Sequence, residues 1–260
     1  MEKITSPQNP LIKKAYALRE ARDRREQGMT VIDGAREIRR ALEAGLSLDK
    51  IFYVKGHQED LLEELTVRKI ECIEVSDKIL EKLAYGERHE GLIALARTPV
   101  RTLSSLKLSD QPLVVVLESL EKPGNLGAVL RTCDGAGVEA VLVCDPKTDL
   151  YNPNVIRSST GVIFSLPVVC AGFEEVASFL RAKKIKICAA APAAQKLYSQ
   201  ADFKGSWALV LGREDQGLSN GWLSLADLKV RIPMNGKADS LNVSVSAAII
   251  LYEALRQRNI

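Results

Sequence analysis

Near-continuous apolar segments alternate with segments of helical pattern over the second half of this chain. The expected strands, rich in β-branched residues, are 113–117, 140–143, 185–189, 208–211 and 229–232. The expected helices are 126–136, 154–159, 174–183 and 242–258. Strands that are apolar on both faces are typical of a parallel sheet that helices cover on both sides. We therefore predict a doubly wound α/β sheet whose ligands bind beyond the carboxyl ends of its strands.

A shorter alternation occupies the first hundred residues. Its expected strands are 30–33, 50–54, 70–75 and 91–95, and its expected helices are 11–26, 35–44, 58–65 and 77–84. This order predicts a small α/β domain. Residues 97–112 hold two prolines and three serines and follow no period. We expect a first domain over 1–96, a linker over 97–112 and a second domain over 113–260.

Composition narrows the class of protein. The 260 residues are 46% hydrophobic and 27% charged, which suits two modest globular domains. The amino terminus lacks the apolar run of a signal peptide, and no apolar run is long enough to cross a bilayer, so we expect a cytoplasmic protein without membrane contact. The five cysteines show no metal-ligand spacing, and we expect no metal site.

Basic side chains are concentrated in the first forty residues, although the net charge is only +3. Arg36, Arg39 and Arg40 have i, i+3 and i+4 spacing and share one face of the expected helix. Together with Lys13 and Lys14 they are candidates for contacts with RNA phosphates. The alternative is a solvated helix face held by ion pairs, and charge alone leaves both interpretations open.

Polar loops follow three of the expected C-terminal strands. In the first loop, Asn125 can cap the next helix, and Arg131 can reach back to hold an anion near the helix start. The second loop, 212–219, has glycines around a charged stretch, and the third, 233–242, offers Ser240 or Asn242 as a helix cap. The first loop can equally be a capped helix with a surface arginine and the second a solvated turn, and in the third loop plain helix capping is the favoured role of Ser240 or Asn242. We find no Walker sequence and no Ser/His/Asp arrangement.

The same three loops resemble the motifs of the SpoU/TrmH family of RNA ribose 2′-O-methyltransferases, within the SPOUT superfamily. The matching segments are 125–132, 209–218, 232–234 and 240–248, and 157–161 is similar to a further family segment. The resemblance covers nearly all of 113–258. The first domain looks like the family's substrate-binding domain, with 31–37 similar to its strand-to-helix turn.

This resemblance implies a fold and a ligand that the spacing alone does not give. It implies a deep trefoil knot in the C-terminal domain, a homodimer packed through the knotted domain, and S-adenosylmethionine bound in the knot. The residues that it places around the cofactor are Leu211, Gly212, Gly217, Ile232, Met234 and Leu241.

The resemblance also assigns the residues around the reacting groups. Arg131 would contact the target phosphate and orient it, and only secondarily assist deprotonation, because the pKa of arginine normally lies above about 12. Asn125, Glu214 and Asn242 match residues that shape the site, and Ser240 is a further candidate.

Several functions remain open at this point. The additional domain favours ribosomal RNA over transfer RNA, because it suggests recognition of a folded RNA by shape and 2′-hydroxyls. A non-catalytic RNA-binding or ribosome-assembly protein on the same scaffold is one alternative. A dinucleotide-binding enzyme is another, since Gly124 and Gly127 follow a strand and Asp145 comes about 20 residues later.

Overall fold

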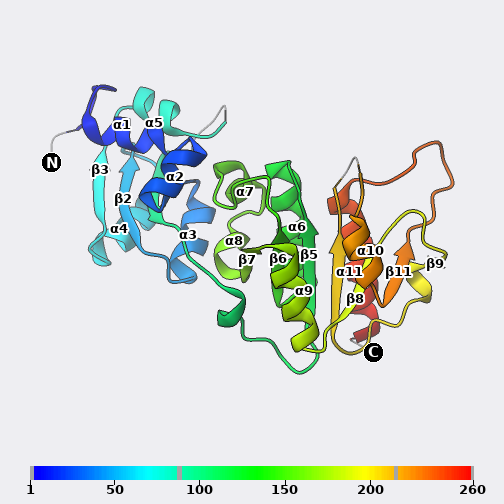
Figure 1. The fold of residues 1–260 in the computed structure, drawn as a ribbon. Helices are drawn as coiled ribbons and strands as arrows, with labels where there is room; N and C mark the ends of the chain where they lie inside the picture. The colour runs from blue at the N-terminus through cyan, green and yellow to red at the C-terminus, as the bar shows by residue number, and fades with distance from the viewer. Residues whose placement is uncertain (1–2, 87–89, 214–215, 259–260) are drawn as a thin grey trace. The chain divides into compact units, whose positions relative to one another are not determined.

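The computed structural model describes residues 3–86, 90–213 and 216–258 (Figure 1). The chain forms two compact units, one of Met1–Val100 with Asp149–Ser165 and one of Arg101–Thr148 with Leu166–Ile260. This division differs from the expected domains in one segment. Residues 149–165, which we expected in the C-terminal domain, pack with the first unit.

The first unit is built on a four-stranded mixed sheet in the order β1-β4-β2-β3. Its strands are β1 (Met29–Asp33), β2 (Leu48–Tyr53), β3 (Glu71–Glu74) and β4 (Leu92–Arg97). Strand β4 runs antiparallel to β1 and β2, and β2 runs parallel to β3. Its helices are α1 (Pro10–Ala17), α2 (Ala21–Gln27), α3 (Ala35–Glu43), α4 (Glu59–Val67), α5 (Asp77–Leu83), α7 (Pro153–Ser158) and α8 (Val162–Ser165). The predicted α/β character of this region is confirmed.

The first predicted helix, 11–26, is in fact two helices. Helix α1 ends at Ala17, and the backbone turns extended at Glu20 before α2 begins. The guanidinium of Arg24 explains the break, because its Nη1 donates to the carbonyl oxygens of Leu18 and Arg19 at 2.8 and 2.7 Å. A side chain from α2 therefore satisfies carbonyl groups that the interrupted helix leaves without amide donors.

The second unit is a seven-stranded sheet in the order β7-β6-β5-β10-β8-β11-β9, and every pairing in it is parallel. The strands are β5 (Leu113–Glu118), β6 (Ala140–Cys144), β7 (Val168–Ala171), β8 (Lys186–Ala190), β9 (Lys196–Leu197), β10 (Trp207–Leu211) and β11 (Leu228–Arg231). The parallel α/β sheet expected from the apolar strands is confirmed. Two short edge strands, β7 and β9, were not predicted.

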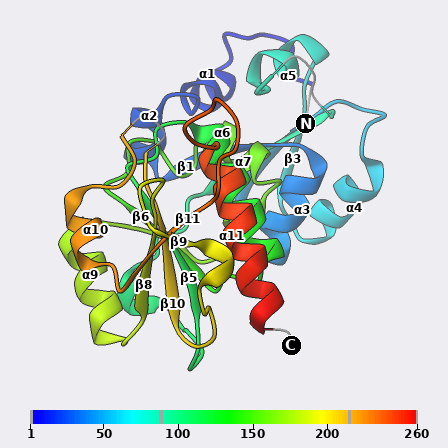
Figure 2. The same cartoon turned by 90° about the vertical axis from the view of Figure 1, so that its right-hand side faces the viewer.

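Helices cover both faces of this sheet (Figure 2). They are α6 (Pro123–Gly135), α9 (Phe173–Ala182), α10 (Asn220–Leu225) and α11 (Val243–Arg258), with short 3-10 turns η1 (Leu103–Ser105) and η2 (Tyr198–Gln200). Helices α6 and α11 pack against each other on one face, and α9 and α10 lie over the other. Alternate residues of β5 and β10, such as Val114 and Val210, form a buried core with Leu180 of α9 and Trp222 of α10.

The order of the strands in the sheet determines which of the connecting loops lie close together. Strand β10 lies between β5 and β8, and β11 follows β8. Because all these strands are parallel, the loops after β5, β10 and β11 leave from the same edge of the sheet. These are the three loops that the sequence singled out. Within the described ranges, no helix is both long and apolar enough to cross a membrane.

Candidate active site

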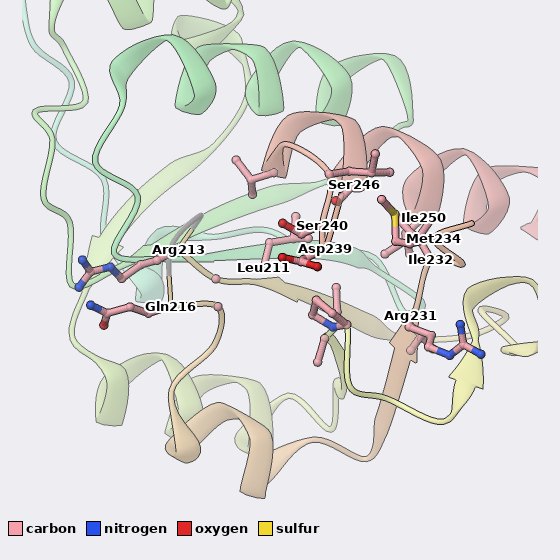
Figure 3. Close-up of a pocket in the computed structure, with 18 residues that line it drawn as sticks. Leu211, Arg213, Gln216, Arg231, Ile232, Met234, Asp239, Ser240, Ser246 and Ile250 are labelled. Carbon is pink, nitrogen blue, oxygen red and sulfur yellow. The ribbon is translucent and has the colours of Figure 1, made fainter. Parts of the chain in front are cut away.

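A cavity of about 340 Å³ lies at the carboxyl ends of β8, β10 and β11 (Figure 3). Its walls come from the ends of these strands, the loops that follow them and the first two turns of α11. The lining residues are Ala190, Ala191, Pro192, Leu211, Gly212, Arg213, Gln216, Gly217, Val230, Arg231, Ile232, Met234, Asp239, Ser240, Leu241, Val243, Ser246 and Ile250. The volume falls in the usual range of small-molecule sites, roughly 300–1,000 Å³.

The structure brings all six residues assigned to the cofactor to this one cavity. They are Leu211, Gly212, Gly217, Ile232, Met234 and Leu241, and the candidate Ser240 lines the cavity with them. The sequence separates these residues by up to thirty positions, and only the parallel order of β10 and β11 places them together. That they bind a cofactor remains a prediction.

The loop after β10 is closed by its own backbone. The amide of Arg213 donates to the Gly217 carbonyl at 3.1 Å, and the amide of Gly217 donates to the Arg213 carbonyl at 3.0 Å. A Cβ atom on Gly212 would lie 2.3 Å from the Gly217 carbonyl oxygen, and Gly217 itself has a φ of +68°. Both glycines are therefore required by geometry, because a side chain at either position would clash with the closed turn or strain its backbone.

Two predicted site residues, Asn125 and Asn242, are in direct contact. The Asn242 Nδ2 atom donates to Asn125 Oδ1 at 3.2 Å. Asn242 Oδ1 in turn accepts from the Ser244 amide and hydroxyl at 2.8 and 2.7 Å, so Asn242 caps α11. We had expected Asn125 to cap α6, and this was wrong. Pro123 starts that helix and places Asn125 inside its first turn.

The amide nitrogen of Asn125 is available for a further contact. This Nδ2 atom is buried and has no hydrogen-bond acceptor among the described residues. Two helices, α6 and α11, begin beside it, and helix starts favour negative charge. Arg131 lies six residues along α6 from Asn125, about 9 Å of helical rise, with an exposed side chain. Glu214, the remaining predicted residue, lies outside the described residues.

Sequence reasoning missed the side chains that connect these loops. Glu118, at the end of β5, is buried and accepts a 2.8 Å hydrogen bond from the Ser219 amide. Arg213 forms a 3.1 Å ion pair with Glu121 in the loop after β5. Glu118 could have been found from the sequence, because it is an acidic residue at the end of an otherwise apolar strand. No pattern distinguished Arg213 from other loop arginines.

Three further cavity residues were also missed by the sequence analysis. Arg213 and Gln216 lie toward one end of the cavity and Arg231 toward the other, with Asp239 between them (Figure 3). Asp239 directly precedes the matched segment 240–248, so its position in the motif was the only available hint. Within the described ranges, no group of three His, Cys, Asp or Glu side chains is arranged to hold a metal ion.

The buried cysteines of this unit do not act as nucleophiles at neutral pH. Burial raises the pKa of the Cys188 thiol to about 12, and burial together with Asp145 raises the pKa of Cys144 to about 12. A thiol must ionise to react, so these side chains behave as small apolar groups.

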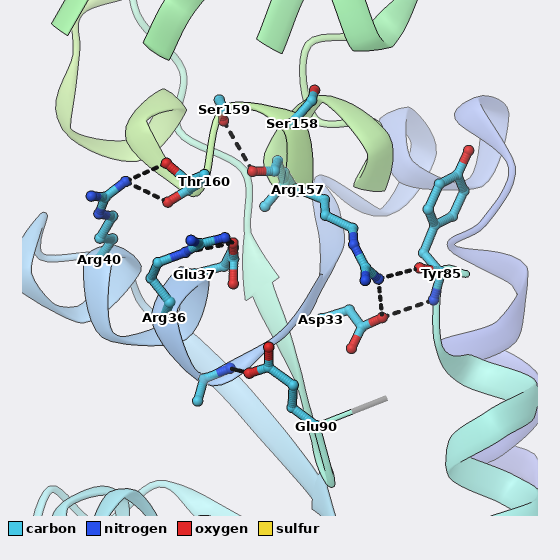
Figure 4. A network of polar contacts seen from close by, with 12 residues as sticks. Asp33, Arg36, Glu37, Arg40, Tyr85, Glu90, Arg157, Ser158, Ser159 and Thr160 are labelled. Atoms are coloured by element: carbon cyan, nitrogen blue, oxygen red, sulfur yellow. Dashed lines mark hydrogen bonds and ion pairs between the residues drawn. The ribbon is translucent and has the colours of Figure 1, made fainter. Parts of the chain in front are cut away.

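In the first unit, the three arginines predicted to contact RNA are bound to other protein groups, and Figure 4 shows two of them, Arg36 and Arg40. Arg36 pairs with the buried Glu37 at 2.7 Å, and Arg39 pairs with Glu64 at 3.1 Å. Arg40 donates to both the carbonyl and the hydroxyl of Thr160 at 2.6 Å. Lys13 and Lys14 are exposed on α1.

The segment that resembles a family motif, 157–161, belongs to the same network. Arg157 donates to the Tyr85 carbonyl at 2.7 Å and lies 3.7 Å from the Asp33 carboxylate. That carboxylate also accepts from the Tyr85 amide at 2.9 Å (Figure 4). Arg157 and Thr160 thus hold this segment against Asp33, Tyr85 and Arg40 of α3, whereas the Ser158 and Ser159 hydroxyls donate to carbonyls of α7.

Comparison with known proteins supports the assignment of both regions. Residues 112–252 match the model of the SpoU rRNA methylase family. Residues 9–94 match the MRM3-like substrate-binding domain. The first match includes the loops after β8, β10 and β11, which line the cavity. The second match corresponds closely to the first hundred residues.

Individual relatives resemble the chain over its whole length. A 23S rRNA (uridine(2479)-2′-O)-methyltransferase of Streptomyces viridochromogenes is 32% identical, over 98% of this chain and 92% of the relative. A crystal structure of an RNA 2′-O ribose methyltransferase is 46% identical, covers 100% of both chains and has a TM-score of 0.90. The SpoU methyltransferase AviRb of Streptomyces viridochromogenes, in complex with the cofactor AdoMet, is 30% identical over 96% of this chain and 98% of its own, with a TM-score of 0.89. The chain therefore belongs to the SpoU rRNA methylase family.

Proposed function

We propose that this protein transfers a methyl group from S-adenosylmethionine to a ribose 2′-hydroxyl of ribosomal RNA. The observation that carries the proposal is that the family-matching loops after β10 and β11 line one cavity, while the third, after β5, leads into α6, whose Asn125 contacts Asn242 at the start of α11. The relatives that match the full length support the reaction, and those whose names give a substrate act on RNA. Residues 1–96 would serve as the RNA-binding domain, in line with the substrate-binding match over 9–94.

The residues around the cavity fit S-adenosylmethionine. Leu211, Ile232 and Leu241 supply apolar walls for an adenine ring, and the closed turn at Gly212 offers backbone groups to its edge. Met234 and Gly217 complete the set that the family resemblance assigns to the cofactor. When bound, the cofactor would supply an activated methyl group on a sulfonium, so that a ribose oxygen attacking this methyl in line would release the cofactor's sulfur as a neutral thioether.

The chain's own residues would orient the RNA and stabilise charge. Arg131 would hold the phosphate next to the target ribose, because a guanidinium binds phosphate oxygens in a bidentate geometry. Asn125, held by Asn242, would present its buried amide to an acceptor on the bound ligand. Ser240 and Glu214 would complete the site around the hydroxyl that loses its proton.

We further propose that the C-terminal domain is knotted and that the protein works as a homodimer through that domain. Family membership supports the knot, and the surface of α11 supports the dimer. Val245 and Tyr252 are 45% and 52% exposed on this helix and lie seven residues apart, on the same face. Apolar side chains at this spacing suit a helix that packs against a second copy.

The test of this function is transfer of labelled methyl groups to total RNA from cells that lack the protein, followed by mapping of the label. The proposal predicts incorporation at a defined position of ribosomal RNA. Label found in transfer RNA alone would overturn the substrate class. S-adenosylmethionine binding without any methylation would favour a non-catalytic RNA-binding protein.

A further inference from the structure

A group of basic side chains around one tyrosine lies on the outer side of α1 and α5. These two helices pack against each other in the core of the first unit (Figures 1 and 2). We call the group formed by Lys13, Tyr16, Arg19, Lys78 and Lys82 the α1–α5 surface. Lys13 lies three residues before Tyr16, and Lys78 lies four residues before Lys82, so each pair shares a helix face.

The ring of Tyr16 holds two of these cations in place. The Arg19 Cζ atom lies 5.4 Å from the ring centroid, and the Lys82 Nζ atom lies 4.9 Å from it. Arg19 also donates a 3.1 Å hydrogen bond to the Lys82 carbonyl, which joins the end of α1 to α5. Tyr16 remains 42% exposed, so the cluster faces solvent.

These contacts order the cations without cancelling their charge. A ring quadrupole and a carbonyl oxygen carry no net charge, whereas a carboxylate neutralises its partner. Arg36 and Arg39 of α3 are paired with Glu37 and Glu64 and are neutralised in this way. Among the residues that the structure describes, no ion pair involves Lys13, Arg19, Lys78 or Lys82.

We propose that the α1–α5 surface is where this domain contacts the phosphate backbone of its RNA, an inference that rests on the proposed function. Ordered cations whose charge is not compensated release counterions when they meet phosphates, and that release drives RNA binding. The exposed ring of Tyr16 adds a surface on which a sugar or a base can pack. Of the RNA contacts predicted from the sequence, this surface keeps Lys13, whereas the α3 arginines are bound to other protein groups.

The first test compares two neighbouring lysines of α1. Lys14 is two residues before Tyr16 and so points to the opposite side of the helix from it, whereas Lys13 shares its face. Filter binding to deproteinised large-subunit ribosomal RNA would be measured between 50 and 200 mM salt. For the Lys13→Ala/Lys82→Ala double variant we expect about tenfold weaker binding and a logarithmic salt slope reduced by roughly 1.4 to 1.8, at about 0.7 to 0.9 per lost contact. Lys14 was also a candidate RNA contact in the sequence, but because its side chain lies on the other side of α1, Lys14→Ala should change affinity less than twofold.

The second test asks whether the aromatic ring of Tyr16 contributes to RNA binding or whether its side chain only fills space. Tyr16→Phe keeps the ring and should bind RNA within about twofold of the wild type, because the cation–π contacts persist. Tyr16→Leu fills similar space without a π-face and should weaken binding about fivefold. Equal affinities for the two variants would remove the ring from the proposal.

Controls distinguish failure of this surface from failure of the proposed function. Each variant should keep the wild-type melting temperature and the wild-type Kd for S-adenosylmethionine. Wild-type RNA binding together with an unchanged salt slope in the double variant would overturn the α1–α5 surface and leave the proposed function standing. A wild-type protein that binds no ribosomal RNA would overturn both.

Discussion

The side-chain amide of Asn242 donates a 3.2 Å hydrogen bond to the side-chain oxygen of Asn125. This contact joins the cap of α11 to the first turn of α6, two segments that lie 117 residues apart in the sequence. One asparagine therefore fixes the start of a helix that lines the cavity and also orients the other predicted asparagine. The contact links the integrity of the cavity to the position of the catalytic candidates.

Replacing Asn242 with alanine should therefore lower both stability and cofactor affinity. The substitution removes the cap of α11 and should cost about 1–2 kcal/mol of unfolding free energy in urea denaturation. The Kd for S-adenosylmethionine should rise several-fold, because the first turns of α11 line the cavity. Asn235→Ala, in the exposed part of the same loop, is the matched control and should change neither quantity. Identical behaviour of the two variants would contradict this role for Asn242.

A methyl group at Gly212 should open the loop after β10. The added Cβ would lie 2.3 Å from the Gly217 carbonyl oxygen, so the backbone pair between Arg213 and Gly217 cannot close. We expect Gly212→Ala to bind S-adenosylmethionine at least tenfold more weakly by calorimetry while remaining folded. Gly236→Ala is the control, since a Cβ there meets nothing within 4 Å. Normal binding by Gly212→Ala would mean that this loop does not shape the cofactor site.

Arg131 should matter for transfer and not for the cofactor. Its side chain is exposed on α6 and does not line the cavity. Arg131→Ala should reduce single-turnover methyl transfer by roughly 10²–10³, the usual cost of losing one charge-stabilising donor, and leave the Kd for S-adenosylmethionine within twofold. Arg131→Lys should recover only part of the rate, because it lacks the planar fork. A parallel loss of binding and turnover would contradict the assignment.

The ion pair between Arg24 and Asp149 should be a major stabilising contact of the first unit. Its Nε–Oδ2 distance is 2.5 Å, and the two side chains are 2% and 16% exposed. Arg24→Leu leaves a shielded carboxylate and two carbonyl groups without their donor, so we expect a loss of about 3–5 kcal/mol in chemical denaturation. Arg22→Leu breaks only the exposed pair with Glu26 and should cost less than about 0.5 kcal/mol. Similar losses in the two variants would show that burial of the Arg24 pair is unimportant.

Exposed cysteines should react with a thiol reagent at a lower pH than buried cysteines, whose pKa is raised. With a pKa of about 12, Cys144 and Cys188 are ionised in roughly one molecule in ten thousand at pH 8 and still barely at pH 10. Ellman's reagent at pH 8 should therefore react first with Cys170, which is exposed, and with the buried thiols only in denaturant. Cys170→Ser should remove the fast phase. Rapid reaction of more than two thiols in the native protein would contradict the buried assignment.

Local pattern was sufficient for much of the fold. Strands β5, β6 and β10 match the predicted segments to within one residue, because uninterrupted apolar residues mark buried parallel strands. The edge strands β7 and β9 were missed because they are only four and two residues long, too short to show a strand pattern of their own. The division of the leading helix was missed because its cause is the Arg24 guanidinium, whose partners depend on tertiary structure.

In the site, too, the sequence indicated individual residues but not the contacts between residues that are far apart in the chain. The resemblance selected the residues that meet at the cavity, but no spacing rule indicated that Asn242 would hold Asn125. The charge pattern of α3 suggested RNA contacts, yet the acceptors of Arg39 and Arg40 lie 25 and 120 residues away. Sequence periodicity gives the face of a helix on which a side chain lies, and it does not give the group that occupies that face in the folded protein.

The proposed reaction is tested most directly by identifying the atom that accepts the methyl group. Ribosomal RNA from cells lacking the protein would be incubated with the purified enzyme and deuterium-labelled S-adenosylmethionine, digested to nucleosides and analysed by mass spectrometry. Ribose 2′-O-methylation predicts that the label appears in a single 2′-O-methylnucleoside, with the mass increase on the ribose fragment and none on the base. Label on a base fragment, or no transfer although the cofactor is bound, would contradict it.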